Sequence, residues 1–457
     1  MLKQLLFVLL LLFTSCGDSN EEAPLPEAPK MTTYSLTELA SGDVDIVVTY
    51  DQRVTLPSGN ISKMSVGDAV VTSASVFLQD LTVRVGSLRR GESYTLRIPK
   101  GTLLGPGDVE AGEASIPIKL EEEEASDYQL VTSNPLPQAR KVYAYLASVY
   151  GKKSLSGTMA NVNWNIAEAE LVQRATGKYP AIAFFDYIHL FASPANWIDY
   201  SDTKVVEDWW NAGGLVGAGW HWNVPNVENG TEYTCTPGNG TQNSDGNWTT
   251  AFRPKHATVE GTWENRVVKA DLKKIAEYLK LLQDKNIPVI WRPLHEAAGN
   301  IYEYTGGTAW FWWGYDGADA YKKLWIYMFD FFKEQGINNL IWVWTTQTKD
   351  DEFYPGDDYV DIVGRDIYNQ KSGTDNAAQY SAVAKSYSKK LVALSECGNV
   401  APVSSQWSAG ARWSFFMPWY QYNATSLDGH GHADTAWWKD AMAQDFVITR
   451  DQLPSMK

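Results

Sequence analysis

Short apolar runs alternate with amphipathic stretches along the chain from about residue 128 onward. In the stretch 264–284, Leu272, Ile275 and Leu279 recur at the spacing of one helical face. The runs between such stretches are apolar at successive positions, as expected of parallel strands that are buried on both faces. Eight runs share this pattern: Leu155–Thr158, Ala181–Tyr187, Gly214–Trp222, Pro288–Glu296, Leu340–Thr346, Ile362–Tyr368, Leu391–Cys397 and Trp413–Tyr420.

Strands that alternate with helices predict an α/β fold with a parallel sheet covered by helices. With eight strands, the expected architecture is a (β/α)8 TIM barrel over residues 128–457. A doubly wound sheet is the alternative, but no G-x-G-x-x-G motif follows the first strand. Gly214, Gly217 and Gly219 have the wrong spacing for that motif, and we expect them to let their strand pack closely.

A different pattern, the alternation of apolar and polar positions, appears between residues 31 and 125. The runs that show it are Val44–Tyr50, Ala74–Phe77, Leu81–Val85 and Tyr94–Pro99. They predict a small all-β, immunoglobulin-like sandwich domain. All 20 tryptophans lie between Trp164 and Trp438, so this domain has none to stack on a sugar ring. We therefore favour a spacer over a sugar-binding module, and we interpret the charged run 121–124 as a solvated linker.

The first 15 residues have the pattern of an export signal. One Lys precedes the unbroken apolar run Leu5–Phe13, which is too short to cross a bilayer and fits the apolar region of a signal peptide. Small residues then precede Cys16, as in a bacterial lipobox, which predicts cleavage before Cys16 and its lipidation. Residues 16–30 contain three prolines and read as an extended tether.

The acidic residues that follow Cys16 resemble the surface-export signal of Bacteroidetes lipoproteins. We therefore expect a lipid anchor in the outer membrane on the cell-surface side, with the periplasmic face as the alternative. The net charge of −15 repels phosphates and anionic lipids, so we expect no nucleic-acid partner and no membrane contact beyond the anchor. We expect a monomer. Three cysteines cannot form a disulfide framework, and we expect Cys397 to be a buried free thiol, a Cys235–Cys397 bridge being the alternative.

Candidate chemistry gathers at the carboxyl ends of the predicted strands, where barrel enzymes place their active sites. The fourth strand closes on Glu296 and the seventh on Glu396. A carboxylate at the end of an apolar strand is costly to bury unless it reacts or is paired. Two such groups are what glycoside hydrolysis needs, one as a proton donor and one ionised. The alternative is that each forms a structural salt bridge with an arginine. Other residues at these ends are His221, Asp366, Tyr368 and Trp419.

Other chemistries find less support in the sequence. The stretch 295–299 contains His-Glu but lacks the second histidine of a zinc-binding H-E-x-x-H motif. His430 and His432 lie between Asp428 and Asp434 and could ligate a cation, but such a glycine-rich loop more often binds none. No G-x-S-x-G motif indicates a serine hydrolase. We expect no metal and no cofactor.

From about Asn134 to Lys457 the chain resembles glycoside hydrolase family 26, the β-mannanase family of clan A. The motifs that carry the resemblance are Gly219-Trp220-His221-Trp222, Arg292-Pro293-Leu294-His295-Glu296, Trp310-Phe311-Trp312-Trp313-Gly314, Asp366-Ile367-Tyr368 and Ser395-Glu396. The resemblance implies retaining endo-hydrolysis of β-1,4-mannosidic linkages in mannan, glucomannan or galactomannan. It implies Glu296 as acid/base and Glu396 as nucleophile.

The resemblance also implies how the substrate is held. Tyr368 is implied to hydrogen-bond the nucleophile, Trp419 to form the floor beneath the scissile sugar and Trp310 to flank the leaving group. The full set of expected substrate-binding residues is His221, Arg292, His295, Trp310, Asp366, Tyr368 and Trp419. One departure from the family is the ten residues of 300–309, which separate the acid/base segment from the W-F-W-W-G motif.

Two alternatives remain open at this point. The same family contains β-1,3-xylanases and mixed-linkage β-glucanases, which would act on another glycan with the same residues. A surface glycan-binding lipoprotein on an inactive barrel belongs to a different functional class. The presence of both Glu296 and Glu396 argues against the inactive barrel.

Overall fold

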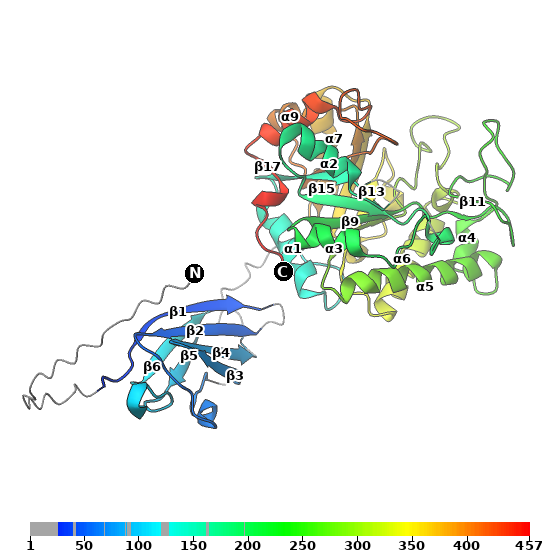
Figure 1. The fold of residues 1–457 in the computed structure, drawn as a ribbon. Coiled ribbons are helices and arrows are strands. Elements are labelled where there is room, and N and C mark those ends of the chain that lie inside the picture. The colour runs from blue at the N-terminus through cyan, green and yellow to red at the C-terminus, as the bar shows by residue number, and fades with distance from the viewer. Residues whose placement is uncertain are drawn as a thin grey trace, which may run out of the picture. The chain divides into compact units, whose positions relative to one another are not determined.

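The computed structural model describes residues 26–39, 43–67, 69–86, 88, 93–119, 128–160, 164–195 and 197–457. The chain divides into two compact units, Met1–Glu124 and Ala125–Lys457, which are described separately here (Figure 1). The predicted signal peptide, Cys16 and the run 121–124 lie outside the described residues.

The N-terminal unit is built from two antiparallel sheets. The first has the order β1 (Met31–Glu38), β2 (Val44–Tyr50), β4 (Asp80–Gly86), β3 (Val70–Phe77), and the second pairs β5 (Ser93–Ile98) with β6 (Ala114–Lys119). Alternate residues of β2, β4, β5 and β6 are buried in one shared core, as the period of two predicts. The all-β character is confirmed, and its immunoglobulin-like assignment stays a prediction.

The second unit is a closed parallel barrel, as predicted. Its strands pair in chain order and β16 pairs with β7, which closes the ring. They are β7 (Ser154–Met159), β8 (Ile182–Asp186), β9 (Leu215–Trp220), β12 (Val289–Pro293), β13 (Leu340–Thr346), β14 (Ile362–Tyr368), β15 (Leu391–Gly398) and β16 (Phe415–Pro418). Most of their residues are buried, because side chains fill the inside and helices cover the outside. A short strand, β17 (Val447–Ile448), also pairs with β7 and was not predicted.

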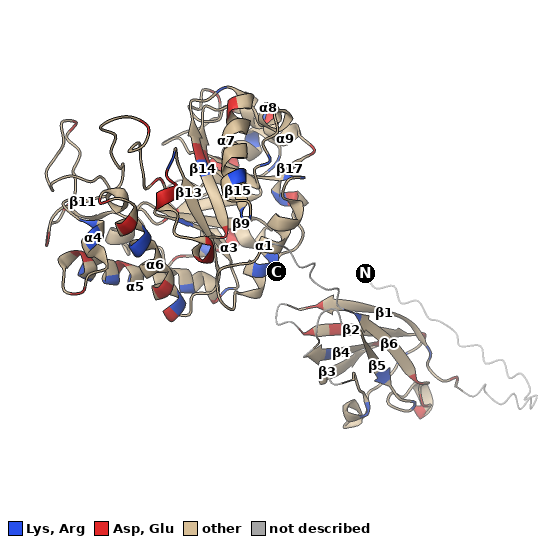
Figure 2. Ribbon diagram, turned by 180° about the vertical axis from the view of Figure 1, so that it is seen from behind, with Lys and Arg blue, Asp and Glu red and all other residues tan. Residues whose placement is uncertain are grey.

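Helices surround the barrel (Figure 1). They are α1 (Pro137–Val149), α2 (Ala167–Thr176), α3 (Lys204–Asn211), α4 (Pro254–Ala257), α5 (Trp263–Gln283), α6 (Ala318–Glu334), α7 (Gly373–Ser386), α8 (Val403–Ser408) and α9 (Thr435–Ala443). In α5 the hydroxyl of Thr262 caps the first turn by accepting from the amide of Asn265, and the predicted apolar face is buried. Acidic and basic side chains are interspersed over these helices (Figure 2). Among the described residues, no helix combines the length and apolar character that a membrane crossing requires.

Loops at the carboxyl ends of the strands build the rim of the barrel. The loop with the hairpin β10 (Val224–Pro225) and β11 (Tyr233–Thr234) and the yellow-green loop after β12 project on the same side in Figure 1. Several predicted strands are too long at their carboxyl ends. The runs 214–222 and 413–420 form strands only as far as Trp220 and Pro418. The run 288–296 ends as a strand at Pro293, and the acid/base candidate lies in the turn that follows.

Candidate active site

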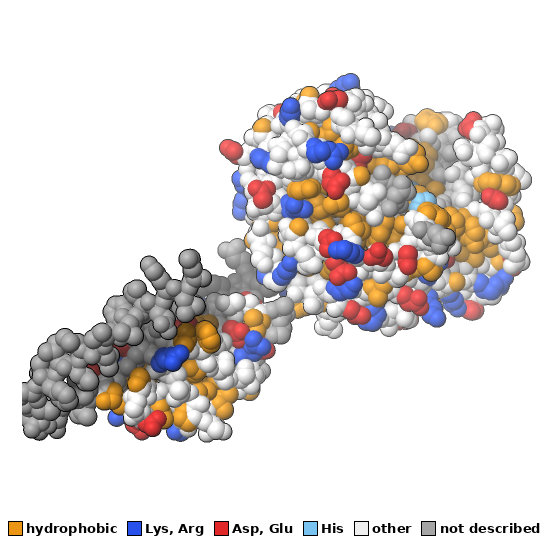
Figure 3. Space-filling view, viewed as in Figure 1, with side chains coloured by type: hydrophobic (Ala, Val, Ile, Leu, Met, Phe, Trp, Pro, Cys, Tyr) orange, Lys and Arg blue, Asp and Glu red, His pale blue; other side chains and the backbone are white. Residues whose placement is uncertain are grey.

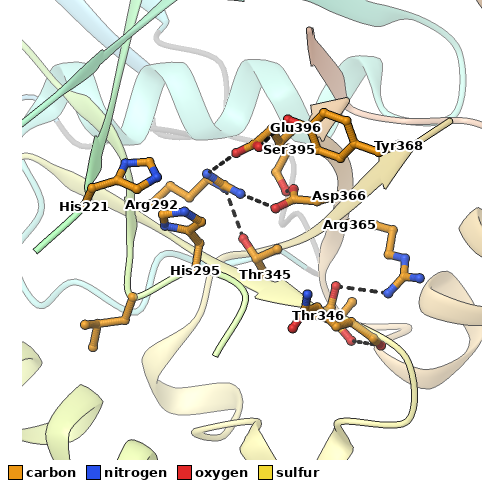
Figure 4. A network of polar contacts seen from close by, with 12 residues as sticks. His221, Arg292, His295, Thr345, Thr346, Arg365, Asp366, Tyr368, Ser395 and Glu396 are labelled. Carbon is orange, nitrogen blue, oxygen red and sulfur yellow. Dashed lines mark hydrogen bonds and ion pairs between the residues drawn. The ribbon is translucent and has the colours of Figure 1, made fainter. Parts of the chain in front are cut away.

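The candidate residues belong to, or directly follow, five strands of the barrel, and Figure 4 shows six of them together, namely His221, Arg292, His295, Asp366, Tyr368 and Glu396. Glu396 belongs to β15, and Asp366 and Tyr368 belong to β14. Arg292 is in β12, whereas His221, His295, Glu296 and Trp419 follow the ends of β9, β12 and β16. The carboxyl ends of parallel strands meet at one end of a barrel, which is why distant sequence positions come together here.

Arg292 lies between two carboxylates. Its Nη1 is 3.1 Å from Oε2 of Glu396, and its Nη2 forms an ion pair with Asp366. Its Nε donates to Oγ1 of Thr345 at 3.1 Å. The Arg292 side chain is only 3% exposed, so these charges are buried together. Arg292 stabilises both carboxylates, whereas the two carboxylates repel each other. The alternative of a salt bridge to arginine therefore describes part of the environment of Glu396.

A bulge in β15 directs two successive side chains into the same cluster. The register with β14 shifts so that Arg365 faces Leu394 and Asp366 faces Glu396. Successive residues of a regular strand point to opposite faces, but a bulge re-aims them. Here the Ser395 hydroxyl donates to Oδ1 of Asp366 at 2.6 Å, while Glu396 accepts from the Tyr368 hydroxyl at 2.5 Å.

The two candidate glutamates have different electrostatic environments. Burial, reinforced by the negative charges of Asp366 and Glu396, raises the pKa of Glu296 well above its usual range. Burial also raises the pKa of Glu396, but the Arg292 charge and the Tyr368 hydrogen bond oppose that rise. The pKa of Glu296 is raised well above its usual value, whereas the rise for Glu396 is opposed by a cation and a donor, so Glu296 is the better proton donor of the two.

His221 and His295 lie close together, and their pKa values are shifted in opposite directions. Their ring centroids are 4.4 Å apart. Burial lowers the pKa of His221, but the Asp186 carboxylate bonded to its Nδ1 and the charge of Glu396 outweigh burial and raise it. Burial, Arg292 and His221 lower the pKa of His295 well below its usual value, so that its ring is neutral.

Aromatic rings surround this polar cluster. The Trp419 and His221 rings lie 5.6 Å apart, and the Phe311 ring lies 5.0 Å from His295. Hydrophobic side chains and a histidine border a hollow on this face of the barrel unit (Figure 3). Trp310 is 41% exposed and connects to the cluster through its backbone, which lies against Gly299.

The insertion 300–309 is closed at its base. The amide of Asn300 donates to the carbonyl of Thr308 at 3.1 Å, and Oδ1 of Asn300 accepts from the Thr308 amide at 2.8 Å. The loop tip bonds instead to the loop after β13, where the Tyr302 hydroxyl donates to Glu352 at 3.2 Å. The ten extra residues therefore project from the barrel without separating Gly299 from Trp310.

The turn that carries Glu296 has an unusual backbone. Leu294 and Glu296 have positive φ values of 49° and 51°. Left-handed conformations cost a residue other than glycine about 1–2 kcal/mol. Such conformations persist only where surrounding contacts fix them, and they are frequent at active sites.

Residues considered for other chemistries have structural partners. Nδ1 of His430 accepts from the amides of His432 and Ala433, and its Nε2 lies 3.3 Å from Glu168. Asp434 caps α9 by accepting from the amide of Trp437. In the described part of the chain, no group of three or more His, Cys, Asp or Glu side chains could hold a metal ion. Cys235 and Cys397 are both free thiols, and Cys397 is buried as predicted.

Sequence reasoning missed several residues that support the site. Asp186 orients His221, Thr345 and Ser395 bond the buried ion cluster, and Phe311 packs on His295. Asp186 carried a usable signal, because it is the last residue of the apolar strand β8. Ser395 and Phe311 stand in motifs quoted above but were given no role of their own, and Thr345 carried no signal.

Three comparisons with known proteins relate the chain to one family. Residues 131–452 match the family model of Glycosyl hydrolase family 26. A mannan endo-1,4-β-mannosidase of Thermothelomyces thermophilus is 34% identical over 326 residues, which are 69% of this chain and 61% of that protein. The chain spans 50 to 61% of the length of the first curated relatives that it matches.

Solved structures extend the likeness to the fold. The family 26 domain of an endo-β-mannanase/endo-β-glucanase from Prevotella bryantii is 42% identical with a TM-score of 0.64, over 71% of this chain and 98% of that chain. A β-mannanase from a symbiotic protist of the termite Reticulitermes speratus, solved with a gluco-manno-oligosaccharide, is 34% identical with a TM-score of 0.60. That match covers 72% of this chain and 98% of the other.

Proposed function

This chain belongs to glycosyl hydrolase family 26, and we propose that it hydrolyses internal β-1,4-mannosidic bonds of mannan, glucomannan or galactomannan with retention of configuration. The observation that carries the proposal is the asymmetric pair of buried carboxyl groups, Glu296 and Glu396. The names of the relatives support mannan as the substrate. Retention and the role of each residue are inferred from the site itself and from the family resemblance.

In the first step, Glu396 attacks the anomeric carbon of the sugar. The carboxylate oxygen forms a bond to that carbon as the bond to the leaving oxygen breaks. Glu296 donates its proton to the leaving oxygen, so that the departing chain leaves as a neutral alcohol. Arg292 and Tyr368 hold Glu396 in its ionised, oriented form.

In the second step, water releases the sugar. Glu296, now ionised, takes a proton from the water as its oxygen bonds to the anomeric carbon. The bond from that carbon to Glu396 breaks, which restores the Glu396 carboxylate and the protonated Glu296. Two inversions give overall retention.

The residues around the pair divide into sugar contacts and supports. His295 was expected to bind substrate, but it is only 2% exposed, so we propose that it supports the site through its contact with the His221 ring. We propose that the Trp419 ring stacks on the scissile sugar and that exposed Trp310 flanks the leaving group. Arg292 and Asp366 were expected to bind substrate, but both side chains are almost fully buried and paired, so we propose that they position Glu396 instead.

A substrate panel tests this function. The purified chain should release oligosaccharides from glucomannan and galactomannan, and not from barley mixed-linkage glucan or β-1,3-xylan. Proton NMR of the first turnovers should show the β-anomer before mutarotation. Preferential cleavage of xylan or mixed-linkage glucan would show that β-mannan is not the preferred substrate. Early appearance of the α-anomer would show inversion of configuration and would contradict the double-displacement mechanism.

Replacing Tyr368 with Phe should shift the acid limb of the pH–activity profile and leave the alkaline limb unchanged. Activity is lost at low pH as Glu396 becomes protonated and at high pH as Glu296 loses its proton. The Tyr368 hydroxyl lowers the pKa of Glu396, so its removal should move the acid limb to higher pH. The alkaline limb should stay in place, and kcat should fall about tenfold or more. Movement of both limbs, or of neither, in a kcat/KM profile would contradict this role.

Removing residues 31–120 should leave activity on short, soluble manno-oligosaccharides within about twofold, the scatter expected of a change outside the site. The described residues of each unit form a buried core of their own, so the barrel should keep its fold. Kinetics on mannopentaose check this expectation. A large rise in KM would show that the N-terminal unit binds glycan.

We also propose that Cys16 is lipidated and holds the protein on the outer face of the outer membrane. The proposal rests on the residues that precede and follow Cys16. Full-length protein expressed in a bacterial host should incorporate a clickable palmitate analogue, and the C16A variant should not. Protease added to intact cells should remove the enzyme if it faces outward. Protection from the protease would favour the periplasmic face.

A further inference from the structure

One segment contacts the turn that carries Glu296 at three backbone positions, two before Glu296 and one after it. Nε1 of Trp313 donates to the carbonyl of His295 at 2.9 Å. The hydroxyl of Tyr321 donates to the carbonyl of Leu294 at 3.0 Å. Gly314 lies so close that a Cβ there would stand 1.7 Å from the carbonyl oxygen of Ala297. The backbone on both sides of Glu296 is therefore fixed by residues 313–321.

This segment, residues 313–321, is itself packed into the barrel. Trp313 and Tyr321 are fully buried. The Trp313 ring stacks on Phe311 with centroids 4.5 Å apart, and Nε1 of the adjacent Trp312 donates to the carbonyl of Trp222 at 2.7 Å. Burial raises the pKa of Tyr321 well above its usual value, so its hydroxyl remains a donor throughout the working pH range.

The held turn is the one that needs support. Leu294 and Glu296 are in left-handed conformations that neither residue favours by itself. A buried carbonyl that loses its only side-chain donor is driven to find another partner, and the turn can move to supply one. A misplacement of about 1 Å at a catalytic group is enough to slow a reaction about a hundredfold.

We infer that Trp313 and Tyr321 are positioning residues for the proton donor, acting through the carbonyls of His295 and Leu294. The second half of the W-F-W-W-G motif then serves the turn of Glu296, with Gly314 providing the close approach. This inference rests on the proposed role of Glu296 as the acid/base. It assigns no sugar contact to Trp313 or Tyr321, since neither is exposed.

The test uses Y321F and W313F with matched controls from the same barrel. The Tyr143 hydroxyl donates to the carbonyl of Asp361 at 3.0 Å, and Nε1 of Trp209 donates to the carbonyl of Leu215 at 2.8 Å. Both control residues are buried, and both carbonyls lie at the amino ends of their strands, away from the site. Y143F and W209F therefore remove the same kinds of bond without touching the turn.

The readout is the ratio of kcat/KM for an oligosaccharide to kcat/KM for the dinitrophenyl glycoside of the same sugar. A displaced proton donor slows departure of the poor leaving group but barely affects dinitrophenolate, which needs no proton. We expect Y321F and W313F each to lower kcat/KM for the oligosaccharide about tenfold or more. For the dinitrophenyl glycoside, kcat/KM should fall less than about threefold. The alkaline limb of the pH profile should also shift. Y143F and W209F should leave the ratio and the limb unchanged.

Equal losses on both substrates with an unmoved alkaline limb would overturn the inference, as would controls that change the ratio equally. If Y321F or W313F does not fold, the kcat/KM ratio of the remaining variant tests the inference. The ratio is measured on whichever β-glycan the parent enzyme cleaves. A parent that prefers xylan would thus contradict the proposed substrate while leaving this test intact.

Discussion

E396A should lose turnover on every substrate, by about 10⁵-fold or more, as other enzymes do when they lose a covalent nucleophile. Without the carboxylate no glycosyl-enzyme bond can form, and a good leaving group cannot compensate. The loss should therefore be as large for a dinitrophenyl mannoside as for mannan. Initial rates on both substrates measure it.

E396Q is the matched control for the structural effects of this change. The amide keeps the volume of the side chain and can still accept from Tyr368, but it cannot attack the anomeric carbon. It should be as inactive as E396A while retaining more of the parent's thermal stability. Activity within about tenfold of the parent in either variant would exclude Glu396 as the nucleophile, since chemistry normally suffers far more.

E296A should separate substrates by their leaving groups. Loss of general acid catalysis costs about 10²–10⁴-fold for a sugar leaving group. The first step on a dinitrophenyl mannoside needs little protonation, so its kcat/KM should remain near that of the parent. The second step still needs a base to activate water, so the glycosyl-enzyme should accumulate and a burst of dinitrophenol should appear.

Azide provides the diagnostic for E296A, because it attacks the glycosyl-enzyme without a base. It should raise kcat on the activated substrate and yield the β-mannosyl azide, with retained configuration. E396A should at most yield the α-azide, because azide then takes the place of the nucleophile. If E296A lost activity on both substrates equally and azide restored neither activity, the acid/base role of Glu296 would have to be withdrawn.

The barrel was predictable because its strands carry a strong signal. Eight apolar runs, each between helical stretches, admit few folds, and all eight form strands of the ring. In the N-terminal unit, β1 escaped prediction because every one of its residues is exposed, which leaves no buried face to detect. The strand β6 has Pro117 near its middle, and proline argues against a strand in sequence reasoning.

The candidate carboxylates were predictable for a different reason. A charge at the end of an apolar strand is unusual enough to mark Glu296 and Glu396 without a structure. Their local backbone was not predictable, since neither Leu294 nor Glu296 is a residue that favours positive φ. The bulge that brings Ser395 and Glu396 to one cluster left no mark in the sequence either. Such features depend on contacts between distant segments, such as the bond from Tyr321 to Leu294.

Trapping the covalent intermediate tests the central claim most directly. A fluorinated mannosyl fluoride forms the glycosyl-enzyme quickly and releases it slowly, so the adduct can be digested and its peptides weighed by mass spectrometry. The account predicts the added sugar on the peptide that contains Glu396, with fragment ions assigning it to that residue. An adduct on Glu296, or β-mannan hydrolysis that yields the α-anomer with no adduct at all, would contradict it.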